Sequence, residues 1–406
     1  MKKMNHTNVL DDLKARGLIF QTSSDDGLHE AFNGPLTIYQ GFDPSGDSLT
    51  VGHLMSLMVM HRLQEAGHKV IFLIGGGTGR VGDPTGKSAT RNLLTRDIVE
   101  ANAAAVRKQV EGMGLVRFTG DNPAVMLNND DWLGKFTFLE DFLIEVARFF
   151  SVNEMVKMTT FEKRLQEGAQ VSLLEFLYPV LQAWDFLHLF RTHNCTVQMG
   201  GQDQWGNILQ GVELVRKATT EPLPDGQSKP GKEVFAMTFP LITTTDGVKM
   251  GKTEKGAVWL DPNKTSPFDL FQYLVKLPDE MVSQLLKLIT FLPLEEIAEI
   301  VKDPKKAQQV LAFEVTKIVH GEEAAQKAAA AESIPEIEVG TEGMPLVELL
   351  VKSGCLKSNS EVVRRVQQGG VRIQNGEKFT DHKAIVSAPC TIQYGKGALL
   401  RVVAKQ

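Results

Sequence analysis

The chain has 406 residues, 42% of them apolar, and this length predicts two or three domains rather than one core. The net charge of −5 argues against a protein that simply coats nucleic acid, although residues 345–406 carry ten Lys/Arg against four Asp/Glu. Three cysteines without paired spacing exclude a disulfide framework and fit a reducing cytoplasm. No apolar stretch approaches the roughly 20 residues that a membrane span needs.

The predicted elements of the first 80 residues come in the order that is typical of a parallel α/β sheet. Residues 1–34 predict one or two helices, and residues 36–39 a short strand that runs into a turn-rich segment. A helix is expected from about residue 51, and a second strand at 70–74 leads into five residues of which four are glycine. Strand, glycine turn, helix and strand predict a parallel sheet, in which ligands bind at the carboxyl ends of the strands.

The remainder of the chain alternates between helical and polar segments. Residues 91–190 are expected to be mostly helical, and residues 267–331 are expected to be helical again. Further strands are expected at 197–199 and 237–242. The other segments are a polar loop at 217–233, a lysine-bearing loop at 249–255, a linker-like stretch at 332–344 and the basic module at 345–406.

Residues 39–54, YQGFDPSGDSLTVGHL, combine a flexible turn with a helix start. Ser45 or Thr50 can cap the helix, and His53 lies in its first turn. The free N–H groups at a helix N-terminus attract phosphate, and imidazole or hydroxyl donors there can stabilise charge on phosphorus. A capped helix with an ordinary histidine remains the alternative.

Residues 249–253, KMGKT, place two lysines three residues apart in a glycine-containing loop. Such a loop can close over a triphosphate, whereas a solvated basic loop is the alternative. Residues 82–88, GDPTGKS, look like a phosphate-binding loop, but Val81 stands where the first glycine of that motif belongs. We therefore exclude the P-loop nucleoside triphosphatases.

Tyr178, Gln182 and Asp185 follow the spacing i, i+4 and i+7, which places them on one face of a helix. Such a polar stripe is either a solvated face or the wall of a polar pocket. The flanking residues are largely Leu and Phe, which favours the pocket.

Together these segments resemble a known family. Thr50–His53 (TVGH) and Lys249–Thr253 (KMGKT) resemble the two signatures of class I aminoacyl-tRNA synthetases, usually written HIGH and KMSKS. The segments at 39–44, 79–87, 178–185 and 200–207 resemble tyrosyl-tRNA synthetases in particular, and the resemblance runs from about residue 8 to the C-terminus. Thr50 and Gly251 depart from the usual signature histidine and serine.

The resemblance implies a role for each matched residue. Tyr39 and Asp185 would bind the phenol of tyrosine, and its ammonium group would be held by Tyr178, Gln182 and Asp83, with Asn129 and Gln204 nearby. Asp43 would face both substrates. The ATP-binding residues would be Ser45, Thr50, Gly52, His53, Gly201 and Asp203, and the departing pyrophosphate would meet Lys87, Arg91, Lys249, Lys252 and Thr253. Magnesium is expected to accompany ATP, held by phosphates and water, so no protein-bound metal site is predicted.

The resemblance also implies the domain order. We expect an α/β, Rossmann-like catalytic domain at 1–232 with a helical insertion around 125–165, and a connector at 233–266. A helical anticodon-side domain at 267–331 and a linker at 332–344 would precede a small α+β RNA-binding domain at 345–406. That last domain resembles one shared with a ribosomal small-subunit protein, and Arg364, Arg365 and Arg372 would contact tRNA(Tyr).

A homodimer in the cytoplasm is expected, with its interface on the helices around 125–165. Phe136, Phe138, Leu139, Phe142 and Phe149 can form that patch or serve as core. Two alternatives remain: a tryptophanyl-tRNA synthetase, against which Tyr39 and Asp185 argue, and an RNA-binding protein that kept the fold but lost catalysis. The intact signature residues and the complete tyrosine pocket argue against the second alternative.

Overall fold

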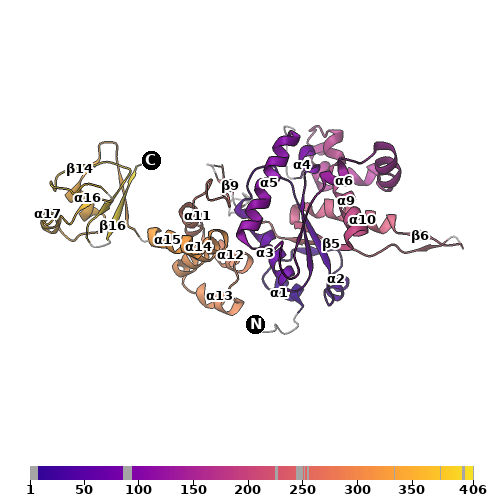
Figure 1. Ribbon diagram of the computed structural model, residues 1–406, viewed down its shortest axis with the longest axis horizontal. Coiled ribbons are helices and arrows are strands. Elements are labelled where there is room, and N and C mark those ends of the chain that lie inside the picture. The colour runs from indigo at the N-terminus through magenta and orange to yellow at the C-terminus, as the bar shows by residue number, and fades with distance from the viewer. Residues whose placement is uncertain are drawn as a thin grey trace.

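The computed structural model describes residues 8–85, 94–224, 227–243, 250, 252–253, 256–332, 334–374, 376–395 and 398–405, with backbone only at 252, 253, 256 and 332. Three bodies follow one another along the longest axis, in the order of the chain (Figure 1). An α/β body comes first, a helical body containing α11 to α15 lies in the middle, and a small α+β body ends the chain.

A six-stranded sheet with the order β1-β8-β5-β2-β3-β4 forms the centre of the first body. Its strands from β8 to β4 are parallel, and β1 pairs antiparallel with β8 at the edge. From β2 the chain moves outward to β3 and β4, then returns to β5 on the other side of β2. This reversal leaves a crevice at the carboxyl ends of β2 and β5, where ligands of open α/β sheets bind. The strands are β1 (Gln21–Thr22), β2 (Thr37–Phe42), β3 (Lys69–Ile74), β4 (Val125–Asn128), β5 (Cys195–Gly201) and β8 (Phe235–Phe239).

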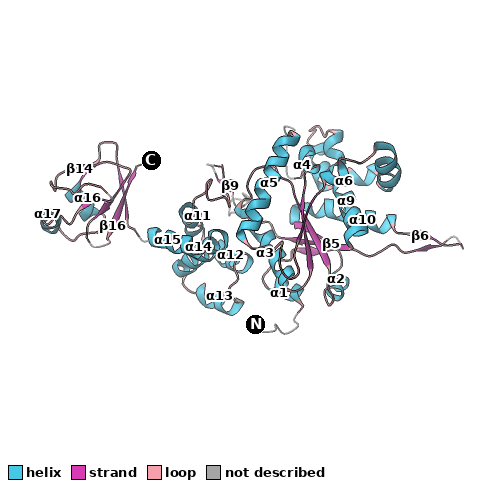
Figure 2. Cartoon of the chain, viewed as in Figure 1, coloured by secondary structure: helices cyan, strands magenta, loops and turns pink. Residues whose placement is uncertain are grey.

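Helices cover both faces of this sheet (Figure 2). Because side chains alternate across a strand, Ile38 and Phe42 pack with α3 and α5, whereas Tyr39 packs with α9 and α10. Tyr39 therefore faces the helix that carries Tyr178, Gln182 and Asp185. The helices of this body are α1 (Val9–Ala15), α2 (Asp25–Ala31), α3 (Val51–Glu65), α4 (Thr78–Val81), α5 (Arg96–Met113), α6 (Asp130–Leu133), η1 (Phe138–Val146), η2 (Ala147–Phe149), α7 (Val152–Met155), α8 (Thr159–Gln166), α9 (Leu173–His193), η3 (Gln202–Gln204) and α10 (Trp205–Ala218).

The structure corrects two expected boundaries and adds one strand. The described residues within 91–190 are mostly helical as predicted, but they also contain β4, an edge strand whose apolar run is short and whose four residues are only half-buried. β8 pairs with β5, so the sheet continues past the predicted boundary at residue 232. Residues 336–339, predicted as part of a linker, form β11 (Glu336–Val339), which pairs with the last strand of the chain.

The polar insert at 221–232 contains a two-stranded ribbon, β6 (Glu221–Pro222) and β7 (Ser228–Lys229), that projects from the α/β body (Figure 1). This ribbon lies within the segment 217–233, which the sequence predicts to be a polar loop. Two residues on each strand form too short a pattern to predict, and none of the four is buried.

The helical body shares its apolar core with the face of the sheet covered by α3 and α5. It consists of α11 (Pro267–Val275), α12 (Asp279–Ile289), α13 (Leu294–Ile300), α14 (Pro304–His320) and α15 (Glu322–Glu332).

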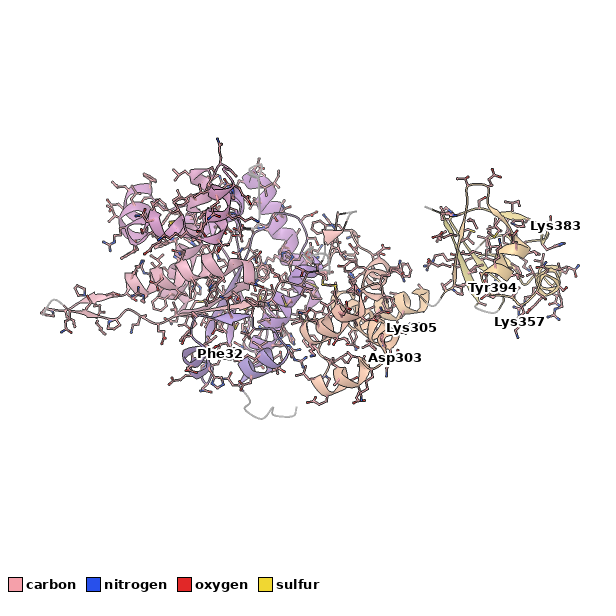
Figure 3. The ribbon with its side chains drawn as sticks, turned by 180° about the vertical axis from the view of Figure 1, so that it is seen from behind. Phe32, Asp303, Lys305, Lys357, Lys383 and Tyr394 are labelled. Atoms are coloured by element: carbon pink, nitrogen blue, oxygen red, sulfur yellow. The ribbon has the colours of Figure 1, made fainter. Side chains whose placement is uncertain are left out.

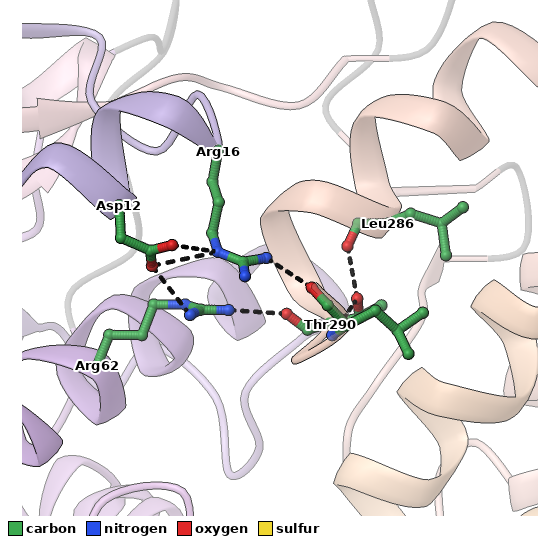
Figure 4. A network of polar contacts seen from close by, with 6 residues as sticks. Asp12, Arg16, Arg62, Leu286 and Thr290 are labelled. Carbon is green, nitrogen blue, oxygen red and sulfur yellow. Dashed lines mark hydrogen bonds and ion pairs between the residues drawn. The ribbon is translucent and has the colours of Figure 1, made fainter. Parts of the chain in front are cut away.

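A polar network joins this body to the sheet domain at the end of α12 (Figure 4). Arg16 donates to the carbonyl of Leu292 (3.1 Å), Arg62 donates to that of Thr290 (2.9 Å), and Asp12 accepts from both guanidinium groups. Burial, followed by repulsion from Arg16, lowers the pKa of Arg62 to about 10, so it stays charged at neutral pH. These cations complement the negative end of the α12 dipole.

The last body has its own apolar core and a sheet with the order β11-β16-β15-β13. Lys357 and Lys383 are exposed on it, and Figure 3 shows both far from the α/β body. Its other elements are β12 (Met344–Pro345), α16 (Leu346–Lys352), α17 (Asn359–Gln367), β13 (Arg372–Ile373), β14 (Ile385–Val386), β15 (Cys390–Gln393) and β16 (Leu399–Ala404). Within the described parts of the chain, no helix combines the length and apolarity needed to cross a bilayer.

Candidate active site

A cavity of about 450 Å³ opens at the carboxyl ends of β2 and β5. It brings together every predicted substrate-binding residue whose side chain the structure describes in this domain. Lys87, Arg91 and Lys249 lie outside the described residues, as do the side chains of Lys252 and Thr253. The predicted residues that line the cavity are Tyr39, Asp43, Ser45, Thr50, Gly52, His53, Asp83, Asn129, Tyr178, Gln182, Asp185, Gly201, Asp203 and Gln204.

The helix α9 supplies one wall because its ends are fixed by local sequence. Ser172 and Glu175 form a capping box, in which each side chain accepts from the backbone N–H of the other. Asn194 adopts the left-handed conformation that ends the helix. The polar stripe predicted on this helix faces the cavity, so the pocket interpretation is confirmed over the solvated face.

Asp185 is held by two donors at one end of the cavity and is only 3% exposed. The indole N–H of Trp132 donates to Oδ1 at 2.7 Å, and the amide of Asn129 donates to Oδ2 at 2.9 Å. Asn129 is among the residues predicted for this pocket, whereas Trp132 is not. The spacing i, i+3 between these two residues gives the signal that could have found it.

The hydroxyl of Tyr39 is buried and finds no hydrogen-bond partner among the residues that the structure describes. Burial, reinforced by the nearby charge of Asp185, raises its pKa well above the ordinary value, so the group stays a neutral O–H. An unpaired buried hydroxyl costs roughly 1–3 kcal/mol. A ligand hydroxyl placed beside Tyr39 and Asp185 would remove that cost.

Burial raises the pKa of Asp185 to about 7, with the donors Asn129 and Trp132 opposing the rise and the charge of Asp43 adding to it. The empty site therefore takes up a proton on this carboxyl as the pH falls through about 7. A ligand that brings an ammonium group and a phenolic O–H donor favours the ionised carboxylate.

For tyrosine, the ligand that the resemblance implies, binding without ATP is therefore expected to weaken as the pH falls below about 7, by up to about tenfold per pH unit, and to level off above it. Equilibrium dialysis between pH 5.5 and 8.5 measures this, and Asp185→Asn should flatten the profile. Affinity that rises towards acid pH would mean that the protonated acid is the binding form.

The middle of the cavity is rich in acceptors. Asp43 accepts from the hydroxyl of Tyr178 (2.7 Å) and from the hydroxyl of Thr78 (2.8 Å). Thr78 is not among the residues predicted from the sequence. Burial and the carboxylate of Asp43 raise the pKa of Tyr178 well above its usual range, which keeps it protonated. A Cβ on Gly75 would lie 2.0 Å from Asp43 Oδ1, so this position requires glycine.

A second group of amides lies beside Asp83. The side-chain amide of Gln204 donates to Asp83 Oδ2 at 2.6 Å. The side-chain amide of Asn207 donates to Oε1 of Gln182 (3.1 Å) and to Oε1 of Gln204 (3.4 Å). Asn207 is 2% exposed and was not assigned a role from sequence. Carboxylate, amide and hydroxyl oxygens gathered in this way suit an ammonium group, which only donates.

Thr50 and His53 occupy the N-terminus of α3 at the other end of the cavity. The backbone N–H of Thr50 donates to Nδ1 of His53 at 3.1 Å, which places the ring proton on Nε2. The ring is reached by water through the cavity although it lies deep in the domain, and this burial lowers its pKa below the usual 6.5. His53 is thus a neutral N–H donor at neutral pH.

The two signature segments meet at this helix start. Val51 N–H donates to Val258 O at 3.0 Å, and Leu260 N–H donates to Leu49 O at 2.9 Å. A Cβ on Gly52 would lie 3.2 Å from Met250 O, so the backbones approach closely. In the sequence between Met250 and Val258, β9 (Lys252–Thr253) pairs with β10 (Gly256–Ala257). Residues some 200 positions apart thus form one end of the cavity.

The three predicted RNA-binding arginines differ in their surroundings. Arg364 and Arg372 are exposed, and Arg372 donates to the side chain of Gln393. Arg365 is half-buried and donates to Tyr394 O (2.7 Å) and to Glu361 (3.1 Å), so it also holds α17 against the sheet.

Comparisons with known proteins agree with this geometry. The family model for class I tRNA synthetases (W and Y) matches residues 30–333, and that for the C-terminal domain of tyrosine–tRNA ligases matches residues 326–397. The tyrosine–tRNA ligase of Clostridium botulinum is 43% identical over 94% of each chain. That of Caldanaerobacter subterraneus is 40% identical over 98% of this chain and 100% of its own.

Among solved structures, a C-terminally truncated mitochondrial tyrosyl-tRNA synthetase of Aspergillus nidulans matches with a TM-score of 0.72 and 33% identity. The match covers 80% of this chain and 94% of that one. The fold and site therefore define a class I aminoacyl-tRNA synthetase of the tryptophan and tyrosine group. Within that class, the chain belongs to the tyrosine–tRNA ligase family.

Proposed function

We infer that this chain activates L-tyrosine with ATP and transfers it to the 3′-terminal ribose of tRNA(Tyr). The carboxylate of tyrosine attacks the α-phosphorus in line, which forms tyrosyl-adenylate and expels pyrophosphate. A ribose hydroxyl of the tRNA then attacks the acyl carbon and releases AMP. The carboxylate is already a nucleophile, so the protein acts in the first step by positioning and charge stabilisation.

The substrate assignment rests on one observation. The Tyr39 hydroxyl, which has no hydrogen-bond partner among the described residues, and the carboxylate of Asp185 lie near each other at one end of the cavity. Tyrosine placed with its phenol there has its ammonium group among Asp43, Asp83 and Tyr178. Its carboxylate then lies towards α3, where Thr50 and His53 face the phosphates. Tryptophan has no hydroxyl for Tyr39, which argues against the related tryptophan enzymes.

The nucleotide roles follow from the same placement. Gly201 and Asp203 line the cavity at the end of β5 and would contact the ribose of ATP. The family resemblance alone assigns Lys87, Arg91, Lys249, Lys252 and Thr253 to the pyrophosphate. Magnesium enters as part of the MgATP substrate. In the described residues, no group of three or more His, Cys, Asp and Glu side chains is placed to hold a metal ion.

The C-terminal body would bind the tRNA outside the catalytic domain. The excess of ten Lys/Arg over four Asp/Glu at 345–406 attracts a polyanion, and Arg364 and Arg372 are exposed to meet it. We place the reaction in the cytoplasm, where the three free cysteines would stay reduced.

Charging of total tRNA with tyrosine, phenylalanine or tryptophan in separate reactions tests the whole function. We expect tyrosine alone to become attached, in an ATP-dependent reaction that releases AMP. Folded protein that binds tRNA but attaches none of the three would instead support the non-catalytic alternative.

We also propose a homodimer built on the surface of η1, α7 and the start of α9. Of the residues predicted for this patch, Phe138 and Leu139 are 70% and 59% exposed, whereas Phe142 is core and Phe136 and Phe149 pack partly against it. The other exposed apolar side chains on these three elements are Leu143, Ile144, Val152, Leu173 and Leu174. An apolar surface of this kind is typical of a protein interface.

Sedimentation at micromolar concentration is expected to give a dimer for the natural chain and a monomer for Phe138→Asp, because the charge would be buried in the interface. Phe20→Asp is the matched control, since Phe20 is 47% exposed on another part of the domain. A natural chain that sediments as a monomer would contradict the proposed assembly.

A further inference from the structure

The turn between β2 and α3 carries much of the ATP-facing surface yet has little regular structure of its own. Asp43, Ser45 and Thr50 line the cavity from it. Within the turn, the described backbone bonds include Ser45 N–H to Asp43 O at 2.8 Å. The position of this turn therefore depends on contacts from neighbouring elements.

The helix α5 supplies such contacts through Gln109. The side-chain oxygen Oε1 of Gln109 accepts from the backbone N–H of Leu49 at 2.8 Å. Its side-chain Nε2 donates to Ser48 Oγ at 3.0 Å. The hydroxyl of Ser48 in turn donates to Leu49 O at 2.8 Å. One amide side chain thus fixes the peptide that precedes the signature residue Thr50.

Asn102 makes the corresponding contact at the start of the turn. Its amide donates to Pro44 O at 2.9 Å, between the cavity-lining residues Asp43 and Ser45. Asn102 and Gln109 are seven residues apart, which is two turns of α5 and a rise of about 10.5 Å on one helix face. Side chains of α5 therefore hydrogen-bond to the backbone at both ends of the turn.

The backbone of Leu49 also connects the turn to the segment that follows the second signature. Its N–H donates to Gln109, and its carbonyl oxygen accepts from Leu260 N–H at 2.9 Å. The next residue, Thr50, orients His53 through its own N–H. A displaced Leu49 would shift both signature segments relative to each other.

We propose that Gln109 is a positioning residue for adenylate formation, and that Asn102 assists it at the other end of the turn. Gln109 holds the Leu49–Thr50 backbone, and this backbone positions His53 for the triphosphate and accepts the hydrogen bond from Leu260. This inference rests on the proposed function, because it assigns a role within ATP activation. Gln109 is not among the residues that line the cavity, so it acts through the backbone it holds.

The test compares Gln109→Met, which keeps the shape without the hydrogen bonds, with Gln109→Glu, which keeps the acceptor for Leu49 N–H. Lys108→Met is the matched control, since Lys108 is exposed on the same helix. The measurements are single-turnover adenylate formation, tyrosine affinity without ATP, and hydrogen exchange of the Leu49 amide.

For Gln109→Met we expect adenylate formation to slow by about 10- to 100-fold, since small misplacements of reacting groups have effects of that size. Tyrosine affinity should stay unchanged, and the Leu49 amide should exchange faster. Gln109→Glu should recover most of the rate and the amide protection, and Lys108→Met should match the natural chain. Asn102→Leu should reduce the rate less than Gln109→Met does.

Three results would overturn the proposal: a full rate in Gln109→Met, equal losses of rate and tyrosine affinity in that variant, or a Gln109→Glu rate as low as that of Gln109→Met. A natural chain that forms no adenylate would contradict the proposed function instead. Exchange of the Leu49 amide would still report whether Gln109 holds this peptide.

Discussion

Asp185→Ala is expected to lower kcat/KM for tyrosine activation by about 10²- to 10⁴-fold, because Trp132, Asn129 and the substrate phenol would all lose their buried acceptor. Each such loss costs roughly 1–3 kcal/mol, and 1.4 kcal/mol corresponds to about a factor of ten. Activation of phenylalanine should fall less, by only the share due to Trp132 and Asn129, because phenylalanine has no hydroxyl to lose. Discrimination between the two amino acids should therefore shrink together with the activity.

Tyrosyl-tRNA synthetases as a family discriminate between these two amino acids by about 10⁵-fold without editing. Exchange kinetics with both amino acids measure the change, with Asp97→Ala, at an exposed position of α5, as the control. If the two activities fell by the same factor, Asp185 would be a structural residue and the phenol would bind elsewhere.

His53→Ala should slow adenylate formation by about 10²- to 10³-fold, the effect of removing one preorganised donor from a developing charge. The neutral Nε2–H, fixed by the bond from Thr50 to Nδ1, is the group that this substitution removes. Tyrosine affinity should be retained, because His53 is not among the residues assigned to the phenol or to the ammonium group. Stopped-flow measurement of adenylate formation, with tyrosine affinity determined separately, tests this split.

His53→Gln offers the matched comparison, because its amide can place an N–H donor near the position of Nε2. We expect it to restore part of the rate. An alanine variant that weakens tyrosine binding as strongly as it slows the reaction would show that His53 supports the fold of the pocket instead.

Much of the site could be predicted because it follows from short-range pattern and from resemblance. The spacing of Tyr178, Gln182 and Asp185 places them on one helix face, and the glycine turns after the first two strands mark the carboxyl edge of the sheet. The strands β2, β3, β5 and β8 were all predicted, because their apolar runs are bounded by polar or glycine-rich segments.

The missed residues act through contacts that local sequence does not record. Thr78, Trp132 and Asn207 orient other side chains, and each does so for a partner at least 25 positions away. Gln109 lies 60 positions from the peptide it holds. β4 and β11 were missed for a similar reason, since their pairing with distant strands, and not their own short runs, defines them.

Exchange of labelled pyrophosphate into ATP, run separately with tyrosine, phenylalanine and tryptophan, tests the central claim most directly. It requires only adenylate formation in the cavity between β2, β5 and α9, without tRNA or the C-terminal body. The pairing of Tyr39 with Asp185 predicts exchange with tyrosine alone. Exchange with tryptophan alone would keep the fold and contradict the assigned substrate, and no exchange with any of the three would contradict catalysis at this site.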